Sequence, residues 1–202
     1  MKLLPNQLPP TLLVLLPSSL QVQCTSLTCA KGERLFDQGQ SPERMFYICN
    51  GEAVLQRVGL HGASLVLQRV REGFISEASL QSNSYHCEGT VTAAGNLVSI
   101  PIPSIKQELL TNPDFAMRWV AMLNKEVKRL RAQCERLSLK SVKDRLLHLI
   151  ETEGEDGKLA LGTGLKSIAA ELSVSHEALY RTVADLEKQN ILCRSGDFIC
   201  YK

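Results

Sequence analysis

The segment 164–186 most constrains how this chain folds, because it has the pattern of two short helices joined by a tight turn. Each half repeats an apolar residue every three or four positions, as a helix with one buried face requires: Leu165, Ile168 and Leu172, then Leu179, Val183 and Leu186. Ala169 and Ala170 are small enough to let the helices approach closely. Ser175 can cap the second helix by accepting a hydrogen bond from a free amide. The pattern predicts a helix-turn-helix, although an αα-hairpin in an all-helical domain shares the periodicity.

The second predicted helix carries polar and charged side chains on the side opposite its apolar face. His176, Glu177, Tyr180 and Arg181 lie near its N-terminus, which is the part of such a helix that enters the DNA major groove. Further on, residues 191–194 and 198–201 flank the turn at 195–197 and predict a small β-hairpin. The C-terminal region is therefore predicted to be a winged helix-turn-helix.

The region 21–103 has a different pattern, with short apolar runs between frequent turn signals. The runs are 45–49, 53–58, 64–70 and 97–100, and glycine-containing turns such as Asn50-Gly51 separate them. Short strands at regular spacing favour a β-sandwich or β-barrel.

A long helix is predicted from residue 105, with a break near Asn112-Pro113. Its apolar residues alternate at spacings of three and four, as in a two-stranded coiled coil: Val120, Leu123, Val127, Leu130, Cys134 and Leu137. The cationic residues flanking this seam are expected to be exposed: Arg118, Lys125, Lys128, Arg129, Arg131 and Arg136. A single helix covering a β-domain has the same periodicity, but the charged flanks favour a dimer helix. Residues 137–140 form a candidate hinge, and Ser141 with Asp144 resembles a capping box that begins a helix to about Thr152.

Composition excludes several classes of protein. The formal charge of +2 means that any basic surface must be local. Seven cysteines without a C-x-x-C pair indicate a reducing compartment and free thiols. The apolar run at 2–16 is interrupted by prolines (Pro5, Pro9 and Pro10) and is not expected to be a signal peptide. No apolar run is long enough to span a bilayer, so no membrane association and a cytoplasmic location are expected.

The order of a β-domain, a long helix and a winged helix-turn-helix resembles the Crp/Fnr family of transcription regulators. The resemblance covers about residues 20–202, and its most specific parts are the Tyr-Ile-x-x-Gly of 47–51 and the second helix at 175–181. Its other residues are Lys31-Gly32-Glu33, Gln38-Gly39, Glu77 within 75–80, and Asn112-Pro113-Asp114. The resemblance implies an α+β fold: an N-terminal antiparallel β-barrel of the jelly-roll, cyclic-nucleotide-binding-like type with a short helical segment (1–104), a dimerisation helix with a hinge (105–140), and a winged helix-turn-helix (141–202).

The family commonly reads a G·C-containing half-site with a glutamate and an arginine four residues apart, which match Glu177 and Arg181 here. The chemistry agrees, since a carboxylate accepts from cytosine N4 and arginine donates twice to guanine. The resemblance implies further base contacts by His176 and Tyr180, and phosphate contacts by Ser175 and Lys166. A solvated Glu177–Arg181 pair is the structural alternative. The expected partners are double-stranded DNA, a second copy of the chain and an unidentified small-molecule effector, and RNA polymerase could contact the charged loop 153–158.

The sensor half departs from the cyclic-nucleotide-binding pattern of the family. Glu77 matches the family's glutamate, but Ser76 replaces the preceding glycine and Tyr85-His86 stands where an arginine and a serine would hold the phosphate. Leu130 stands where the long helix often offers a hydroxyl. We therefore expect no cyclic AMP binding. Glu77, Tyr85, His86 and Leu130 could instead line a pocket for another metabolite, or the protein could sense no ligand.

No cofactor or metal is expected. Cys24 and Cys29 are too few and wrongly spaced for the family's iron–sulfur cluster. Haem would need axial ligands such as His61, His86 or Cys87, but a lone histidine is more often structural. Cys87 and Cys134 are conceivable redox thiols, without a sequence signal of thiolate character.

The chain is not expected to be an enzyme. A cupin-type metalloenzyme needs paired histidines, whereas the four histidines here are scattered, and no catalytic triad, phosphate loop or carboxylate pair is present. The sequence therefore predicts a dimeric, sequence-specific DNA-binding regulator. The alternative is a dimeric sensor of a metabolite or haem whose DNA binding is lost or secondary.

Overall fold

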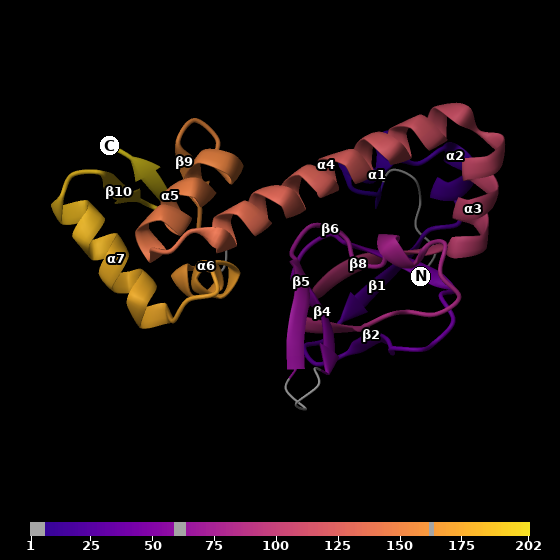
Figure 1. Cartoon of the computed structure of the whole chain (residues 1–202). Helices are drawn as coiled ribbons and strands as arrows, with labels where there is room; N and C mark the ends of the chain where they lie inside the picture. The colour runs from indigo at the N-terminus through magenta and orange to yellow at the C-terminus, as the bar shows by residue number, and fades with distance from the viewer. Residues whose placement is uncertain (1–6, 59–63, 162–163) are drawn as a thin grey trace. The chain divides into compact units, whose positions relative to one another are not determined.

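The computed structural model describes residues 7–58, 64–161 and 164–202 (Figure 1). The chain divides into two compact units, 1–121 and 122–202, and the division falls inside one long helix. Pro5, the predicted turn at 60–62 and the conceivable haem ligand His61 lie outside the described residues.

The first unit is a mixed α and β structure in which two antiparallel sheets pack as a sandwich. Helices α1 (Pro10–Leu15) and α2 (Ser18–Gln21) precede the strands. One sheet has the order β1-β8-β3-β6 and the other β2-β7-β4-β5. Apart from the paired β4 and β5, consecutive strands lie in different sheets, as in a jelly roll. The predicted barrel is thus an open pair of four-stranded sheets. The strands are β1 (Thr25–Cys29), β2 (Arg34–Phe36), β3 (Arg44–Ile48), β4 (Glu52–Val58), β5 (Ser64–Val70), β6 (Gly73–Phe74), β7 (Glu88–Ala93) and β8 (Gly95–Pro101).

The sequence pattern located β3, β4, β5 and β8 to within about two residues at each end, but it did not mark the other four strands. β7 shows why, because its sequence Glu-Gly-Thr-Val-Thr-Ala has few large apolar residues. A strand of this composition is formed by its pairing with β2 and β4, which the local pattern does not encode.

Aromatic rings fill the interior of the sandwich. Phe36 stacks on Tyr85 with ring centroids 4.0 Å apart and lies 5.9 Å from the ring of Phe46. Gly89 makes this possible, because a Cβ at that position would lie 2.6 Å from the Phe36 ring. The Tyr85 hydroxyl donates a hydrogen bond of 2.7 Å to the carbonyl of Arg44, so the one polar group of this cluster is satisfied.

Two helices follow the sandwich. α3 (Ile102–Thr111) begins three residues before the predicted start, because Pro103 is well tolerated in the first turn of a helix. α4 (Pro113–Ser138) begins at the predicted break, and Asn112 Oδ1 accepts a hydrogen bond of 3.1 Å from the Phe115 amide. The side chains of Phe115 and Trp119 are buried, and Trp119 meets the edge of Phe74 with ring centroids 5.3 Å apart.

The prediction that all six flanking cations of α4 are exposed is wrong for three of them. Arg136 is fully buried, and Arg118 and Arg129 are half-buried. Arg118 donates to the Leu15 carbonyl and Arg129 to Glu126, because a long guanidinium can reach a partner beneath the surface while its stem covers apolar atoms.

The second unit has the elements of a winged helix-turn-helix. After α4 come α5 (Val142–Glu153), β9 (Lys158–Ala160), α6 (Leu165–Glu171), α7 (His176–Lys188), β10 (Leu192–Ser195) and β11 (Phe198–Tyr201). The three strands form one antiparallel sheet in the order β10-β11-β9. Its core joins residues of α5, α6, α7 and the sheet, among them Leu146, Leu149, Ile168, Val183 and Ile199.

The capping and turn chemistry of this unit largely follows the sequence. The Ser141 hydroxyl accepts from the Asp144 amide at 3.0 Å, and a further hydrogen bond of 2.6 Å joins it to the Asp144 carboxylate. The predicted charged loop 153–158 ends one residue into β9, an element that the sequence did not reveal. Its tight turn places Asp156 and Gly157 at positive φ, which suits a two-residue hairpin connection.

Candidate DNA-binding site

The turn between α6 and α7 fixes where the second helix begins. Ser173 takes a left-handed conformation (φ 54°), and the Val174 amide donates to the Ala169 carbonyl at 3.0 Å. Ser175 then caps α7 by accepting from the Ala178 amide at 3.1 Å, as predicted. Of the two small residues expected between the helices, Ala169 is buried but Ala170 is exposed, so only Ala169 allows the close approach.

α7 divides sharply into a buried and an exposed side. Leu179, Val183 and Leu186 are at most 2% exposed. The other side presents the four predicted base-reading residues together. The side chains of Glu177 and Arg181 are 83% and 73% exposed, Tyr180 is 45% exposed, and the ring of His176 packs against that of Tyr180 with centroids 4.4 Å apart. One face of α7 thus presents a hydrogen-bond acceptor (the carboxylate), a guanidinium with several donors, and two aromatic rings.

Glu177 and Arg181 form an ion pair on the surface of α7, the structural alternative to base contacts. Arg181 Nη2 lies 3.1 Å from Glu177 Oε1, four residues apart on the same helix. An exposed pair of this kind contributes only about 0.3–0.5 kcal/mol. Opening it to engage base edges would therefore cost little, and the pair holds both groups extended from the same helix face.

The predicted phosphate-binding residues lie near the start of each helix of the motif. Lys166 is exposed in the first turn of α6. Ser175 is exposed, and its hydroxyl oxygen is used in the cap while its proton can still be donated. The N-terminal end of α7, with its free amides and positive dipole end, suits a phosphate nearby.

An ion pair that the sequence did not reveal ties the wing to the second helix. Arg194 of β10 donates two hydrogen bonds, of 2.8 and 2.7 Å, to the Glu187 carboxylate near the end of α7. The Arg194 guanidinium lowers the pKa of Glu187. The two residues are seven apart and belong to different elements, so only the packing of the hairpin on α7 brings them together.

The predicted effector residues are distributed differently. Tyr85 is 3% exposed and belongs to the aromatic core, whereas His86 is exposed and Glu77 is half-buried as the first residue of the short 3₁₀ helix η2 (Glu77–Ser79). Leu130 is 41% exposed on α4, within the second unit. The Tyr85 ring is therefore packed within the sandwich, and its hydroxyl is bonded to the Arg44 carbonyl.

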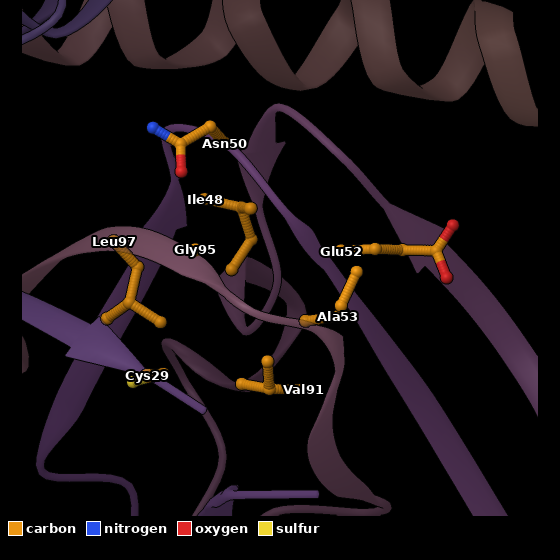
Figure 2. A pocket seen from close by; sticks show the side chains of 9 residues that line it. Cys29, Ile48, Asn50, Glu52, Ala53, Val91, Gly95 and Leu97 are labelled. Atoms are coloured by element: carbon orange, nitrogen blue, oxygen red, sulfur yellow. The ribbon is translucent and has the colours of Figure 1, made fainter. Parts of the chain in front are cut away.

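Two cavities in the sandwich are lined by other residues. One is a small pocket of about 10 Å³ whose apolar lining includes Ile48, Val91 and Leu97, and the Glu52 carboxylate points away from it (Figure 2). The other is an open groove of about 480 Å³ between β1, β2 and β3, with Arg34 and Arg44 among apolar Leu27 and Phe46. The first has room for about one water molecule, and the second is the size of a small metabolite.

The predicted seam of α4 is an apolar stripe that the single chain leaves largely uncovered. Val120, Val127 and Leu130 are 47%, 44% and 41% exposed. Cys134 is also exposed, and Leu123 and Leu137 are half-buried.

The described residues contain no group of three or more histidine, cysteine, aspartate or glutamate side chains that could hold a metal ion. Within the same residues, no helix has the length and apolar character needed to cross a membrane.

Comparison with known proteins places the fold. No protein-family model matches the chain. The Global nitrogen regulator of Nostoc sp. (strain PCC 7120) is 22% identical over 160 residues, which cover 77% of this chain and 70% of that protein. Among solved structures, FixK2 from Bradyrhizobium japonicum superposes with a TM-score of 0.67 at 17% identity, covering 89% of this chain and 92% of FixK2. A CooA mutant from Carboxydothermus hydrogenoformans gives 0.66 at 17% identity, covering 89% and 84%.

These similarities define the class of fold. A jelly-roll sandwich, a long helix and a winged helix-turn-helix follow one another along the chain. This is the fold of the Crp/Fnr-type regulators, as the resemblance in the sequence predicted.

Proposed function

We propose that the chain is a sequence-specific DNA-binding transcription regulator of the Crp/Fnr type. The observation that carries the proposal is the exposed face of α7, where His176, Glu177, Tyr180 and Arg181 stand together while the opposite face is buried. A carboxylate and a guanidinium on one helix face match the donors and acceptors of a G·C pair in the major groove. The 22% identity to a Global nitrogen regulator supports the same function.

The proposed unit of binding is a homodimer. The stripe from Val120 to Leu137 supports this, since exposed aliphatic residues at coiled-coil spacing gain free energy when a second helix covers them. Two-fold symmetry would then present two α7 helices to a palindromic operator with half-sites about one helical turn apart. The position of the operator relative to a promoter would decide between activation and repression, and the loop 153–158 could contact RNA polymerase.

In this proposal, an unidentified small-molecule effector controls DNA binding, or no effector is needed. The aromatic filling around Tyr85 argues against a ligand at that place, whereas Glu77 and His86 still offer polar groups nearby in the sequence. Cyclic AMP is not proposed as the effector, because the residues 85–86 lack an arginine to pair with its phosphate.

Selection of bound duplexes from a random DNA pool tests the proposal directly. The purified full-length chain, without added ligand, is expected to enrich a palindrome containing fixed G·C pairs. The double variant Glu177→Ala/Arg181→Ala is the matched control and should lose that motif. If the wild type enriches nothing, alone or with the small-molecule fraction of a cell extract, the chain is not a sequence-specific regulator. A dimeric sensor without DNA binding would then be the better account.

A further inference from the structure

Two cysteines face each other across the wing. β10 and β11 pair in antiparallel register with Cys193 directly opposite Cys200. Residues opposite each other in such a ladder point to the same face of the sheet. The two thiols are therefore neighbours, although six residues separate them in the sequence.

This face of the wing is the one turned away from the core. The core of the second unit contains Leu192, Ile199 and Leu159 of the sheet, but neither cysteine. Because strand residues alternate between faces, Cys193 and Cys200 lie on the opposite side with Phe198, which is 44% exposed. Cys193 is half-buried, and Cys200, in the central strand, is 7% exposed. Small solutes can thus approach the pair from the Cys193 side.

The ladder places the pair within reach of a disulfide. The Lys202 amide donates to the Ile191 carbonyl at 3.1 Å, which makes Leu192 and Tyr201 a non-hydrogen-bonded pair and Cys193 and Cys200 a hydrogen-bonded one. The Cα atoms of such a pair are about 5.5 Å apart. Disulfides join residues whose Cα atoms are about 4.4–6.8 Å apart, so the Cα separation is suitable. The Cβ atoms of a hydrogen-bonded pair, however, are normally farther apart than the Cβ atoms of a disulfide. The bond would therefore form with some strain, which is typical of labile, regulatory disulfides.

The other cysteines lack this arrangement. Burial raises the pKa of the Cys24 and Cys29 thiols to about 11, and it also raises the pKa of Cys49 and Cys87. Such thiols stay protonated and react slowly. Cys134 is exposed on α4, where a second chain could present the same residue, so it serves as an internal comparison for disulfides between chains.

We propose that Cys193 and Cys200 are a peroxide-sensitive dithiol whose reversible disulfide weakens DNA binding, an effect that rests on the proposed function. Hydrogen peroxide oxidises one thiol to a sulfenic acid and is itself converted to water. The other thiol attacks that sulfur, a second water leaves, and the disulfide forms. The peroxide is reduced by two electrons, which the two thiols supply. A dithiol reductant reverses the reaction by exchange.

The wing is connected to the DNA-reading helix, so a change at the pair can reach α7. Cys193 is adjacent to Arg194, whose two hydrogen bonds to Glu187 hold β10 against α7. Drawing the two strands together at residues 193 and 200 changes the local twist on which that bidentate geometry depends.

Peptide mapping of the full-length chain after treatment with hydrogen peroxide is the primary test. We expect a 193–200 disulfide within one chain, removed by dithiothreitol and absent from Cys193→Ser and Cys200→Ser. The same samples are assayed on the selected operator. Oxidation should lower the affinity of the wild type and of Cys134→Ser by about fivefold or more, in the range of ordinary coupling free energies. Cys193→Ser should bind equally well before and after peroxide.

Three outcomes would overturn the inference. One is that peroxide gives no 193–200 linkage, only bonds between chains at Cys134 or overoxidised thiols. The second is that the linkage forms and operator affinity does not change. The third is that Cys193→Ser loses affinity on oxidation as the wild type does. If neither the reduced nor the oxidised protein binds DNA, the proposed function is wrong, and so is the proposed effect of the disulfide on DNA binding. The peptide map then still shows whether Cys193 and Cys200 form a disulfide.

Discussion

The buried guanidinium of Arg136 donates a hydrogen bond to the carboxylate of Glu153, joining the last turn of α4 to the last residue of α5. The same guanidinium donates to the Thr152 hydroxyl at 3.0 Å and lies 3.5 Å from the Glu171 carboxylate of α6. His148 and Glu135 form a second cross-connection between α4 and α5, 3.5 Å apart. The C-terminal end of α4 is thus bonded to both α5 and α6 of the winged helix-turn-helix, so a displacement of this end would also displace α6.

Replacing this arginine should destabilise the second unit. Arg136→Ala removes a fully buried cation and deprives the Glu153 and Glu171 carboxylates of this ion-pair partner. Because both carboxylates are partly exposed, water softens the loss, and we expect a decrease of about 2 kcal/mol in the free energy of unfolding. Urea unfolding followed by circular dichroism measures it. Exposed Arg131→Ala, on the same helix, is the control and should change stability by less than about 0.5 kcal/mol. Equal effects of the two substitutions would show that the buried network contributes little.

Arg181→Ala tests the reading of bases by α7. The variant should lose about 1–3 kcal/mol of binding free energy on the selected operator and accept any base at one position of each half-site. The loss should not affect folding, since the Arg181 side chain is 73% exposed. Affinity for a panel of single-base operator variants measures both effects. Lys166→Ala is the matched comparison for a phosphate contact, and it should weaken all sequences alike. A uniform loss for Arg181→Ala as well would assign that residue to the DNA backbone instead of a base.

The apolar stripe of α4 should hold the dimer. Leu130→Asp places a charge at a position that is 41% exposed in the single chain and would be covered in a coiled coil. We expect the variant to sediment as a folded monomer at concentrations where the wild type is dimeric, and to lose operator affinity, because two half-sites are no longer bound together. Lys128→Asp, which also introduces an aspartate on an exposed position of the helix, should leave the dimer intact. A wild type that is itself monomeric would refute the assignment of the stripe.

The sandwich should be sensitive to acid through Glu52. Burial alone raises the pKa of this carboxyl, but the Thr92 hydroxyl and the Arg69 and Arg71 guanidiniums outweigh burial and hold the pKa below its ordinary value. A carboxyl whose pKa is lower in the folded protein than in the unfolded chain stabilises the folded state at pH values above its unfolded-state pKa. This stabilisation is lost as the pH falls through the pKa of the folded state.

Glu52→Gln should therefore cost about 2 kcal/mol of unfolding free energy at neutral pH and progressively less below the ordinary pKa of 4.5. Urea unfolding of wild type and variant over a pH series measures the difference. Glu43→Gln replaces an exposed carboxyl beside the start of β3 and should show no such convergence. If the difference in unfolding free energy between wild type and Glu52→Gln were the same at every pH, the substitution would act through packing or hydrogen bonds and not through the loss of the Glu52 charge.

Local patterns in the sequence determined much of the second unit. The spacing of Leu179, Val183 and Leu186 determines the buried face of α7, and Ser175 determines where that helix begins. Both are local effects of helical periodicity and capping, which involve residues three or four apart. The exposed group around Arg181 follows directly, since whatever lies opposite a buried face is presented to solvent.

Only the tertiary structure decided the features that join distant segments. β7 and β9 are strands because they pair with partners far along the chain. Tyr85, a candidate lining residue of an effector pocket, is buried because Phe36 stacks on it where Gly89 leaves room for the Phe36 ring. Arg136, expected in solvent, is buried because Glu153 and Glu171 surround it, and Cys193 meets Cys200 through the register of the wing. A side chain's exposure and partners depend on what packs against it, which periodicity along one element does not specify.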